Sequence, residues 1–82
     1  VKYYMHKSTN WNILITGAAG FIGTSWVKML IQKDIPFKSV IGTDVRQQTP
    51  INHPKYSFTH LDICDPDLSK FLRKYQITHV IH

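Results

Sequence analysis

The sequence predicts an α/β fold, in which helices flank a mainly parallel sheet in the order β-α-β-β-α-β. Apolar runs of strand length alternate with amphipathic segments of helix length, and no repeat or Gly/Ser-rich linker interrupts them. Parallel neighbours in a sheet need crossover connections, which are normally right-handed helices. The last run is a strand with no helix after it, so the predicted architecture is incomplete, the first half of a doubly wound domain.

The first strand and the first helix lie on either side of a glycine-rich stretch. Residues 11–16, WNILIT, contain three consecutive apolar residues, which is typical of a strand buried on both faces. Pro36 prevents the following helix, residues 21–33, from continuing. Its apolar residues recur at helical spacing, and we expect the face they form, on which Trp26 is a packing residue, to be buried: Ile22, Trp26, Met29 and Leu30.

Short apolar runs predict three further strands. Residues 38–45 form the second strand, to which Val40 and Ile41 give the apolar character. Residues 56–63 form the third strand and residues 77–82 the fourth.

The second helix is predicted over residues 65–75. Asp65 is a suitable N-cap, and Pro66 suits the first helical position, where no backbone N–H is needed. Four apolar residues then share one face of this helix: Leu68, Phe71, Leu72 and Tyr75. The segment before the first strand, residues 1–10, is a polar leader, and residues 11–82 form a single unit.

The composition excludes several classes of protein. Ten Lys and Arg against five acidic residues give a net charge of +5, which leaves contact with an anionic partner open. These positive charges form no run longer than Arg73-Lys74, so we expect no nucleic-acid partner. We also expect no membrane partner, because no apolar run approaches the roughly 20 residues of a membrane span.

A single cysteine limits the chemistry further. Cys64 alone can form neither an intramolecular disulfide nor a multi-cysteine metal site, which fits a reducing compartment and a cytoplasmic location. His60, Asp62 and Cys64 alternate along the third predicted strand and would share one face. Without a further ligand they predict packing, with Cys64 as a small hydrophobe, and not a metal site.

The glycines between the first strand and helix follow a G-x-x-G-x-x-G pattern. Gly17 permits a tight turn from strand to helix, Gly20 lets a phosphate approach the backbone, and Gly23 lets the helix pack closely. The helix N-terminus adds unpaired N–H groups and the positive end of its dipole. We therefore predict a pyrophosphate cradle, the alternative being a flexible turn followed by a tolerated helix glycine.

An acidic residue at the end of the second strand completes the pattern. Asp44 is placed to accept hydrogen bonds from the ribose of an adenine dinucleotide, and its charge repels a 2′-phosphate. NAD is therefore favoured over NADP as the cofactor. Arg46 argues the other way, since a nearby cation can hold a 2′-phosphate.

Together these segments resemble the extended short-chain dehydrogenase/reductases, which include NAD-dependent nucleotide-sugar epimerases and dehydratases. The similar pieces, in this order, are ILITGAAGFIG, VIGTDVR, FTHLDICDP and ITHVIH. The resemblance covers about residues 12–82, but only about the first quarter of a typical member. It implies a Rossmann-like fold and a function as the NAD-binding N-terminal portion of such an enzyme.

The resemblance also implies roles for particular residues. The backbone N–H groups of Phe21 and Ile22 would bind the pyrophosphate, while Asp62 and the backbone of Ile63 would lie beside the adenine. The family's catalytic Ser or Thr and its Tyr-x-x-x-Lys pair lie downstream of the cofactor loop, so no residue of this chain is assigned a catalytic role. The nucleotide-sugar substrate would likewise bind only in a longer chain.

Two features fall outside this assignment. A Tyr-x-x-x-Lys pattern does occur from Tyr3 to Lys7, but it precedes the first strand and is interpreted as coincidence. The alternative function is a non-catalytic Rossmann-like module that associates with another chain, or forms a homo-oligomer, through the exposed side of its fourth strand.

Overall fold

The computed structural model describes residues 11–33 and 37–82, and the leader, the Tyr3 to Lys7 pattern and Pro36 lie outside these ranges. It contains six elements in the predicted order. They are β1 (Asn12–Thr16), α1 (Phe21–Gln32), β2 (Ser39–Asp44), β3 (Tyr56–His60), α2 (Leu68–Lys74) and β4 (His79–Ile81).

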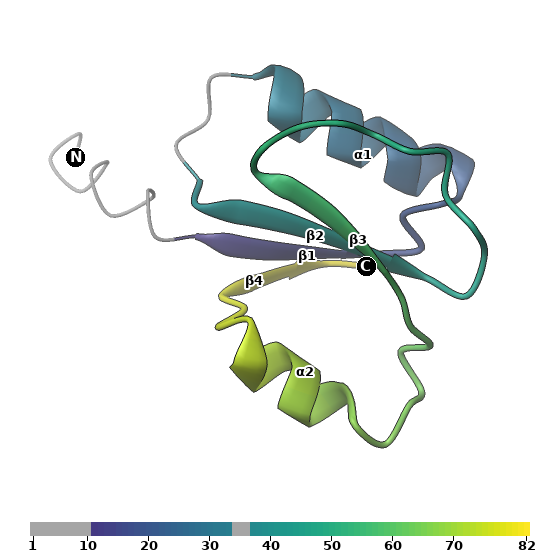
Figure 1. Cartoon of the computed structure of the whole chain (residues 1–82), viewed down its shortest axis with the longest axis vertical. Helices are drawn as coiled ribbons and strands as arrows, with labels where there is room; N and C mark the ends of the chain where they lie inside the picture. Colours follow the sequence, from purple (N-terminus) through teal and green to yellow (C-terminus); the bar gives the residue numbers. More distant parts are fainter. Residues whose placement is uncertain (1–10, 34–36) are drawn as a thin grey trace, which may run out of the picture.

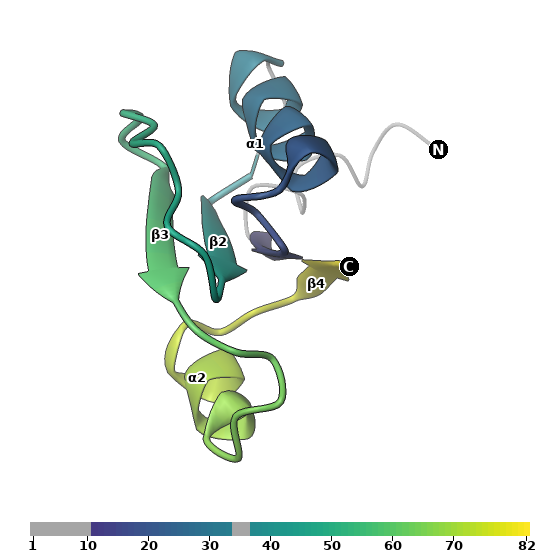
Figure 2. The same ribbon diagram turned by 90° about the vertical axis from the view of Figure 1, so that its right-hand side faces the viewer.

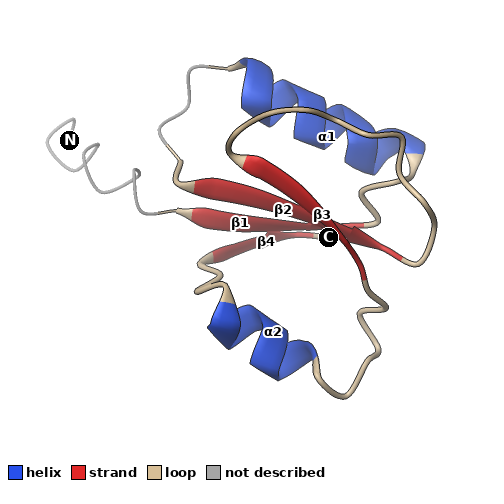
Figure 3. Cartoon of the chain, in the orientation of Figure 1, coloured by secondary structure: helices blue, strands red, loops and turns tan. Residues whose placement is uncertain are grey.

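The four strands form one parallel sheet in the order β3-β2-β1-β4 (Figure 3). β1 pairs with β2 in the register Asn12 to Ser39 and with β4 in the register Ile13 to His79. Because all the strands run in the same direction, their carboxyl ends meet at one edge of the sheet. The loops that follow β1, β2 and β3 therefore begin close together.

The helices lie on opposite faces of this sheet. Figure 1 shows α1 on one side and α2 on the other, and the turned view in Figure 2 shows the same separation. The connection from β1 through α1 leads to the neighbouring strand β2, whereas the connection through α2 leads from edge strand β3 across to edge strand β4. The predicted α/β architecture is confirmed.

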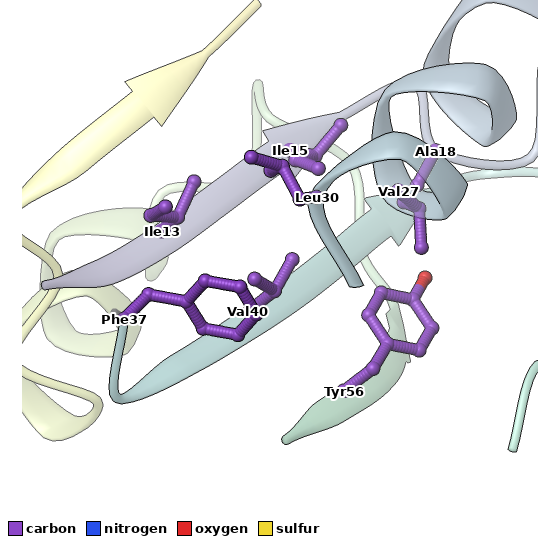
Figure 4. Packing of buried hydrophobic residues seen from close by; sticks show 8 residues of the cluster. All are labelled: Ile13, Ile15, Ala18, Val27, Leu30, Phe37, Val40 and Tyr56. Atoms are coloured by element: carbon purple, nitrogen blue, oxygen red, sulfur yellow. The ribbon is translucent and has the colours of Figure 1, made fainter. Parts of the chain in front are cut away.

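The hydrophobic core lies between the sheet and α1. Ile13 and Ile15 of β1 pack with Val40 of β2 and with Val27 and Leu30 of α1, all of them buried (Figure 4). Ala18, in the loop after β1, is fully buried in the same cluster, which fixes the glycine-rich loop to the core.

The predicted buried face of α1 is wrong, except for Leu30. Ile22 is 71% exposed, and Trp26 and Met29 are each 39% exposed, so Trp26 is not a core residue. The residues that face the sheet are Val27 and Leu30, on the same side as Gly23. The reason is the rotation of the helix about its axis, which is set by a contact of Gly23 described below.

The second helix begins later than predicted. Asp67, and not Asp65, is the residue before the first helical position, and Pro66 lies outside α2. The carboxylate of Asp65 accepts a hydrogen bond from the N–H of Asp67 at 2.8 Å. This local turn competes with helix geometry, so the helix starts only at Leu68.

The third strand ends earlier than predicted, at His60. Asp62 and Cys64 lie in the following turn, where the N–H of Cys64 donates to the Asp62 carboxylate at 2.9 Å. They do not alternate along a strand with His60, and Cys64 is exposed, so a role for it in core packing is wrong. Within residues 11–33 and 37–82, neither helix has the length and apolar character needed to cross a membrane.

Candidate functional site

The glycine-rich loop turns the chain sharply from β1 into α1. Gly17 has a φ of 64°, in the left-handed region that glycine adopts without a steric penalty. The N–H of Gly20 donates to the carbonyl of Gly17 at 3.1 Å, which closes the turn. Residues 17–20 therefore form a tight turn that ends directly before the first residue of the helix, Phe21.

Hydrogen bonds to Ala18 hold this turn against the sheet. Its N–H donates to the carbonyl of Thr43 in β2 at 3.0 Å. Its carbonyl accepts from the hydroxyl of Thr24 at 2.7 Å and from the side-chain amide of Gln48 at 2.8 Å. The loop is thus fixed before any ligand binds.

Gln48 is itself held by a buried tyrosine. The hydroxyl of Tyr56 donates to Oε1 of Gln48 at 2.5 Å, and Figure 4 shows this hydroxyl pointing toward Ala18 and Val27. Burial raises the pKa of Tyr56, although the hydrogen bond to Gln48 opposes that rise, so the hydroxyl keeps its proton and remains a donor. The sequence analysis missed both residues, because Gln48 lies in a loop and nothing local marks its partner.

Gly23 is the point where α1 contacts the glycine-rich loop. A Cβ atom at this position would lie 2.8 Å from the carbonyl carbon of Gly17 and 2.9 Å from Cα of Ala18, and closer still to the Gly17 oxygen. These neighbours are backbone atoms, which cannot move aside. The absence of a side chain therefore lets the first turn of the helix rest on the loop and sets which face of α1 is buried.

The N-terminus of α1 is free of side-chain competitors. Gly20 occupies the N-cap position and provides no side-chain cap, and no acidic residue lies in the first turn. The first N–H groups of a helix have no partner within it, and the dipole makes this end attractive to anions. Phe21 and Ile22 are 89% and 71% exposed, so their side chains do not pack into the core.

Asp44 ends β2 with a buried carboxylate. Its Oδ2 accepts a hydrogen bond from the N–H of Ala19 in the glycine-rich loop at 3.0 Å, and its Oδ1 accepts one from the N–H of Arg46 at 3.0 Å. The guanidinium of Arg46 also contacts both oxygens. The carboxylate therefore connects the loop after β1 with the loop after β2.

Burial alone would raise the pKa of Asp44, but the hydrogen bonds from Arg46 and Ala19 and the charge of Arg46 outweigh it. The net effect lowers this pKa below its usual 3.8, so the carboxylate is charged at neutral pH. A depressed pKa means that the ionised group stabilises the fold above the unfolded-state value. That stabilisation is lost as the pH falls through the folded-state value.

We therefore expect the Asp44→Asn variant to be less stable than the wild type at neutral pH, and the difference to shrink below pH 3.8. Urea denaturation at neutral pH and at about pH 3 measures both differences. Asp67→Asn, which removes an exposed carboxylate that caps no helix N–H, is the control. An Asp44→Asn difference that is the same at both pH values would contradict the ionic role of Asp44.

A cleft of about 370 Å³ opens at the carboxyl edge of the sheet between β1, β2 and the loop after β3. It brings together four residues that the sequence analysis proposed from separate segments: Gly17, Asp44, Asp62 and Ile63. Thr16, Thr43, Val45, Leu61 and His82 complete its lining. Its wall is mainly apolar and includes two carboxylates, those of Asp44 and Asp62, as expected for a site that holds a planar ring and a sugar.

A second cleft, of about 290 Å³, is also lined by Gly17. Ile22 and Gly23 line it, together with Trp26 from α1 and His82 after β4. The side chain of His82 contacts the hydroxyl of Thr16 at 2.6 Å. Gly17, Thr16 and His82 line both clefts, so the two clefts adjoin at these residues.

The remaining predicted residues lie outside both clefts. Gly20 and Phe21 are at the helix N-terminus, and Arg46 lies over the Asp44 carboxylate with its guanidinium toward Gly20. The sequence analysis did not assign Thr16 to the site, although its position directly before the first glycine was a usable signal.

Comparisons with known proteins found a matching family and several relatives. The family model for the NAD-dependent epimerase/dehydratase family matches residues 13–82. A dTDP-glucose 4,6-dehydratase of Neisseria gonorrhoeae is 36% identical over 80 residues, covering 87% of this chain and 22% of that protein. A protein provisionally named UDP-glucose 4-epimerase, from Methanocaldococcus jannaschii, is 36% identical over 70 residues, covering 85% of this chain and 23% of its own length.

A similar solved structure is that of dTDP-glucose 4,6-dehydratase from Bacillus anthracis in complex with NAD. It superposes with a TM-score of 0.75 at 25% identity, covering 87% of this chain and 25% of that one. The chain therefore spans about a quarter of the length of the proteins it matches.

Proposed function

Because the chain belongs to the NAD-dependent epimerase/dehydratase family, we propose that residues 11–82 form the N-terminal part of a dinucleotide-binding domain that holds NAD. The observation that carries this proposal is that Gly17 lines two adjoining clefts. A dinucleotide consists of two nucleosides joined by a pyrophosphate. A turn of glycine and alanine residues that adjoins two clefts suits a ligand of that shape.

The pyrophosphate and the adenosine of the cofactor would have matching residues in this chain. The pyrophosphate would bind the N–H groups of Phe21 and Ile22 at the start of α1, where Gly20 leaves the backbone accessible. The adenosine ribose would donate to the carboxylate of Asp44. The adenine would occupy the 370 Å³ cleft beside Asp62 and Ile63.

The activity we propose is that of a nucleotide-sugar epimerase or dehydratase that acts by transient hydride transfer. When bound, NAD supplies the group that accepts and returns the hydride, and the residues of this chain hold and orient it. The family's catalytic Ser or Thr and Tyr-x-x-x-Lys pair have no counterpart in the described residues, 11–33 and 37–82. The proton transfers would therefore depend on residues beyond His82 in a longer chain. The names of the relatives support this class of activity and include both a dehydratase and an epimerase.

A second candidate function is association through a strand edge. β4 is an edge strand of only three residues, and the side chain of Val80 on it is 53% exposed. An edge strand can pair with another chain. A chain that acts as such a module would form a defined oligomer and would not bind a dinucleotide. Sedimentation at several concentrations would reveal the oligomer.

A cytoplasmic location is part of the proposal. Its support is the single cysteine, which leaves an exposed free thiol at Cys64 and no intramolecular disulfide.

Calorimetric titration of the chain with NAD tests the main proposal. We expect saturable binding of one NAD per chain, accompanied by protection against unfolding. At a concentration of about 100 times Kd, bound NAD should raise the free energy of unfolding by about 2.7 kcal/mol. A folded chain that gives neither binding heat nor protection would rule out the proposed cradle and favour the module.

A further inference from the structure

The peptide group between Ala18 and Ala19 is hydrogen-bonded at both ends. Its oxygen, the carbonyl of Ala18, accepts from the hydroxyl of Thr24 and from the side-chain amide of Gln48. Its N–H, that of Ala19, donates to Oδ2 of Asp44 at 3.0 Å. A peptide group is planar, so its oxygen and its N–H turn together. Whatever fixes the Ala18 oxygen therefore also fixes the direction of the N–H that holds Asp44.

The amide of Gln48 is oriented by a second buried residue, Tyr56. Gln48 is 6% exposed and Tyr56 is 8% exposed. The Tyr56 hydroxyl donates to Oε1 of Gln48 at 2.5 Å, while Nε2 of the same amide lies 2.8 Å from the Ala18 oxygen. A flipped amide would place its oxygen against the Ala18 oxygen, an acceptor against an acceptor. Tyr56 and Ala18 together thus fix the direction in which Gln48 donates.

The sheet leaves space for this hydroxyl beneath the glycine-rich loop. A Cβ atom at Gly42 of β2 would clash with the hydroxyl oxygen of Tyr56 and would lie 2.7 Å from Cβ of Ala18. The two donors to Ala18 then come from different elements, because Thr24 belongs to α1 and Gln48 to the loop between β2 and β3. An oxygen held from two sides cannot pivot about either donor.

We propose that Gln48 and Tyr56 are positioning residues of the dinucleotide site, which act through the peptide between Ala18 and Ala19 on the carboxylate of Asp44. The proposal rests on the dinucleotide function proposed above. Asp44 lines the 370 Å³ cleft, and the N–H of Ala19 fixes one of its two oxygens. Without the donor from Gln48, Thr24 alone would hold the Ala18 oxygen, the peptide could tilt, and the carboxylate would lose part of the orientation that a ribose needs.

Titration of the Gln48→Met variant with NAD tests this. Methionine is similar in size to glutamine but cannot donate to the Ala18 oxygen. We expect NAD affinity to fall at least about fivefold, as for the loss of one oriented hydrogen bond. The control is Gln32→Met, which makes the same change at an exposed position in the last turn of α1 and should bind NAD like the wild type.

The pKa of Asp44 is a second readout, which needs no ligand. A less well oriented N–H of Ala19 stabilises the charged carboxylate less, so Gln48→Met should raise this pKa toward its usual 3.8. NMR titration of the Asp44 carboxyl carbon measures it. Gln32→Met should leave it unchanged.

A double variant separates positioning from stability and keeps the test valid if Gln48→Met is poorly folded. Gln48→Met leaves the buried Tyr56 hydroxyl without the acceptor it now has, which costs stability in itself. Adding Tyr56→Phe removes that hydroxyl and should restore part of the free energy of unfolding, measured in urea. It returns no donor to Ala18, so NAD affinity and the pKa of Asp44 should stay as in Gln48→Met. Recovery of both together with stability would show that the pair has only a structural role.

The outcomes separate this inference from the proposed function. Unchanged NAD binding in a folded Gln48→Met variant, or weaker binding with an unchanged pKa of Asp44, would overturn the positioning role and leave the cradle intact. A folded wild-type chain that does not bind NAD would overturn the proposed function itself, and with it the role of Gln48 and Tyr56 in binding.

Discussion

The Gly23→Ala variant is expected to be strongly destabilised and to lose the geometry of the glycine-rich loop. A methyl group at this position would overlap the backbone of Gly17 and Ala18, with Cβ only 2.8 Å and 2.9 Å from atoms of those residues. Overpacking that side chains can absorb costs about 1–3 kcal/mol. Because the neighbours here are backbone atoms, we expect a loss of more than about 3 kcal/mol in the free energy of unfolding.

Helix propensity and the contact with the loop predict opposite changes in the stability of Gly23→Ala, so the sign of the measured change decides between them. By helix propensity alone, alanine in place of glycine stabilises a helix by about 1 kcal/mol. Urea denaturation followed by circular dichroism gives the sign directly. The control is Gly20→Ala, whose Cβ would meet the end of the exposed Arg46 side chain and lie 3.3 Å from the Gly17 oxygen. Shifts of a few tenths of an ångström relieve the backbone contact, so its stability should stay within about 1 kcal/mol of the wild type. A Gly23→Ala variant as stable as the wild type would show that the loop contact does not position α1.

The Gly20→Glu variant is expected to fold normally and to lose dinucleotide binding. Gly20 has φ −78° and ψ 170°, which any residue can adopt, and its Cβ would meet the exposed end of the Arg46 side chain and lie 3.3 Å from the Gly17 oxygen. A carboxylate at the N-terminus of α1 interacts favourably with the helix dipole, so stability is maintained. The same carboxylate would occupy the space proposed for the pyrophosphate and would repel its negative charge. NAD affinity should fall at least about hundredfold, equivalent to about 2.7 kcal/mol.

The measurement is the same NAD titration, combined with a melting curve of each variant without ligand. Ser69→Glu adds an equal charge on α2, on the other face of the sheet from α1, and should bind NAD like the wild type. If Gly20→Glu and wild type bind NAD equally, the pyrophosphate does not lie at the start of α1.

The element order could be predicted because it depends on local patterns. Three consecutive apolar residues from Ile13 to Ile15 indicate a buried strand in any context, and the glycines directly after them mark a tight turn. The structure contains six elements in the predicted order, and the family match agrees with the predicted resemblance. The element ends were less predictable: Asp65 turns the chain through a hydrogen bond to the N–H of Asp67, so α2 starts at Leu68.

The buried face of α1 could not be predicted in the same way. Apolar residues occur on more than one side of this helix, and periodicity selected the side of Ile22, Trp26 and Met29, which the structure leaves largely exposed. A glycine contributes nothing to a hydrophobic pattern. Yet the contact of Gly23 with the loop is what directs Val27 and Leu30 to the sheet.

By itself, the sequence determined the α/β order, the G-x-x-G-x-x-G turn between β1 and α1, and the acidic residue that ends β2, because each depends on neighbours along the chain. Only the tertiary structure decided that Gly17, Asp44, Asp62 and Ile63 line one cleft and that Arg46 covers the Asp44 carboxylate. The physical reason is that parallel pairing gathers the carboxyl ends of distant strands at one edge. Which side chains meet there depends on strand order, on the rotation of α1 and on the path of each loop.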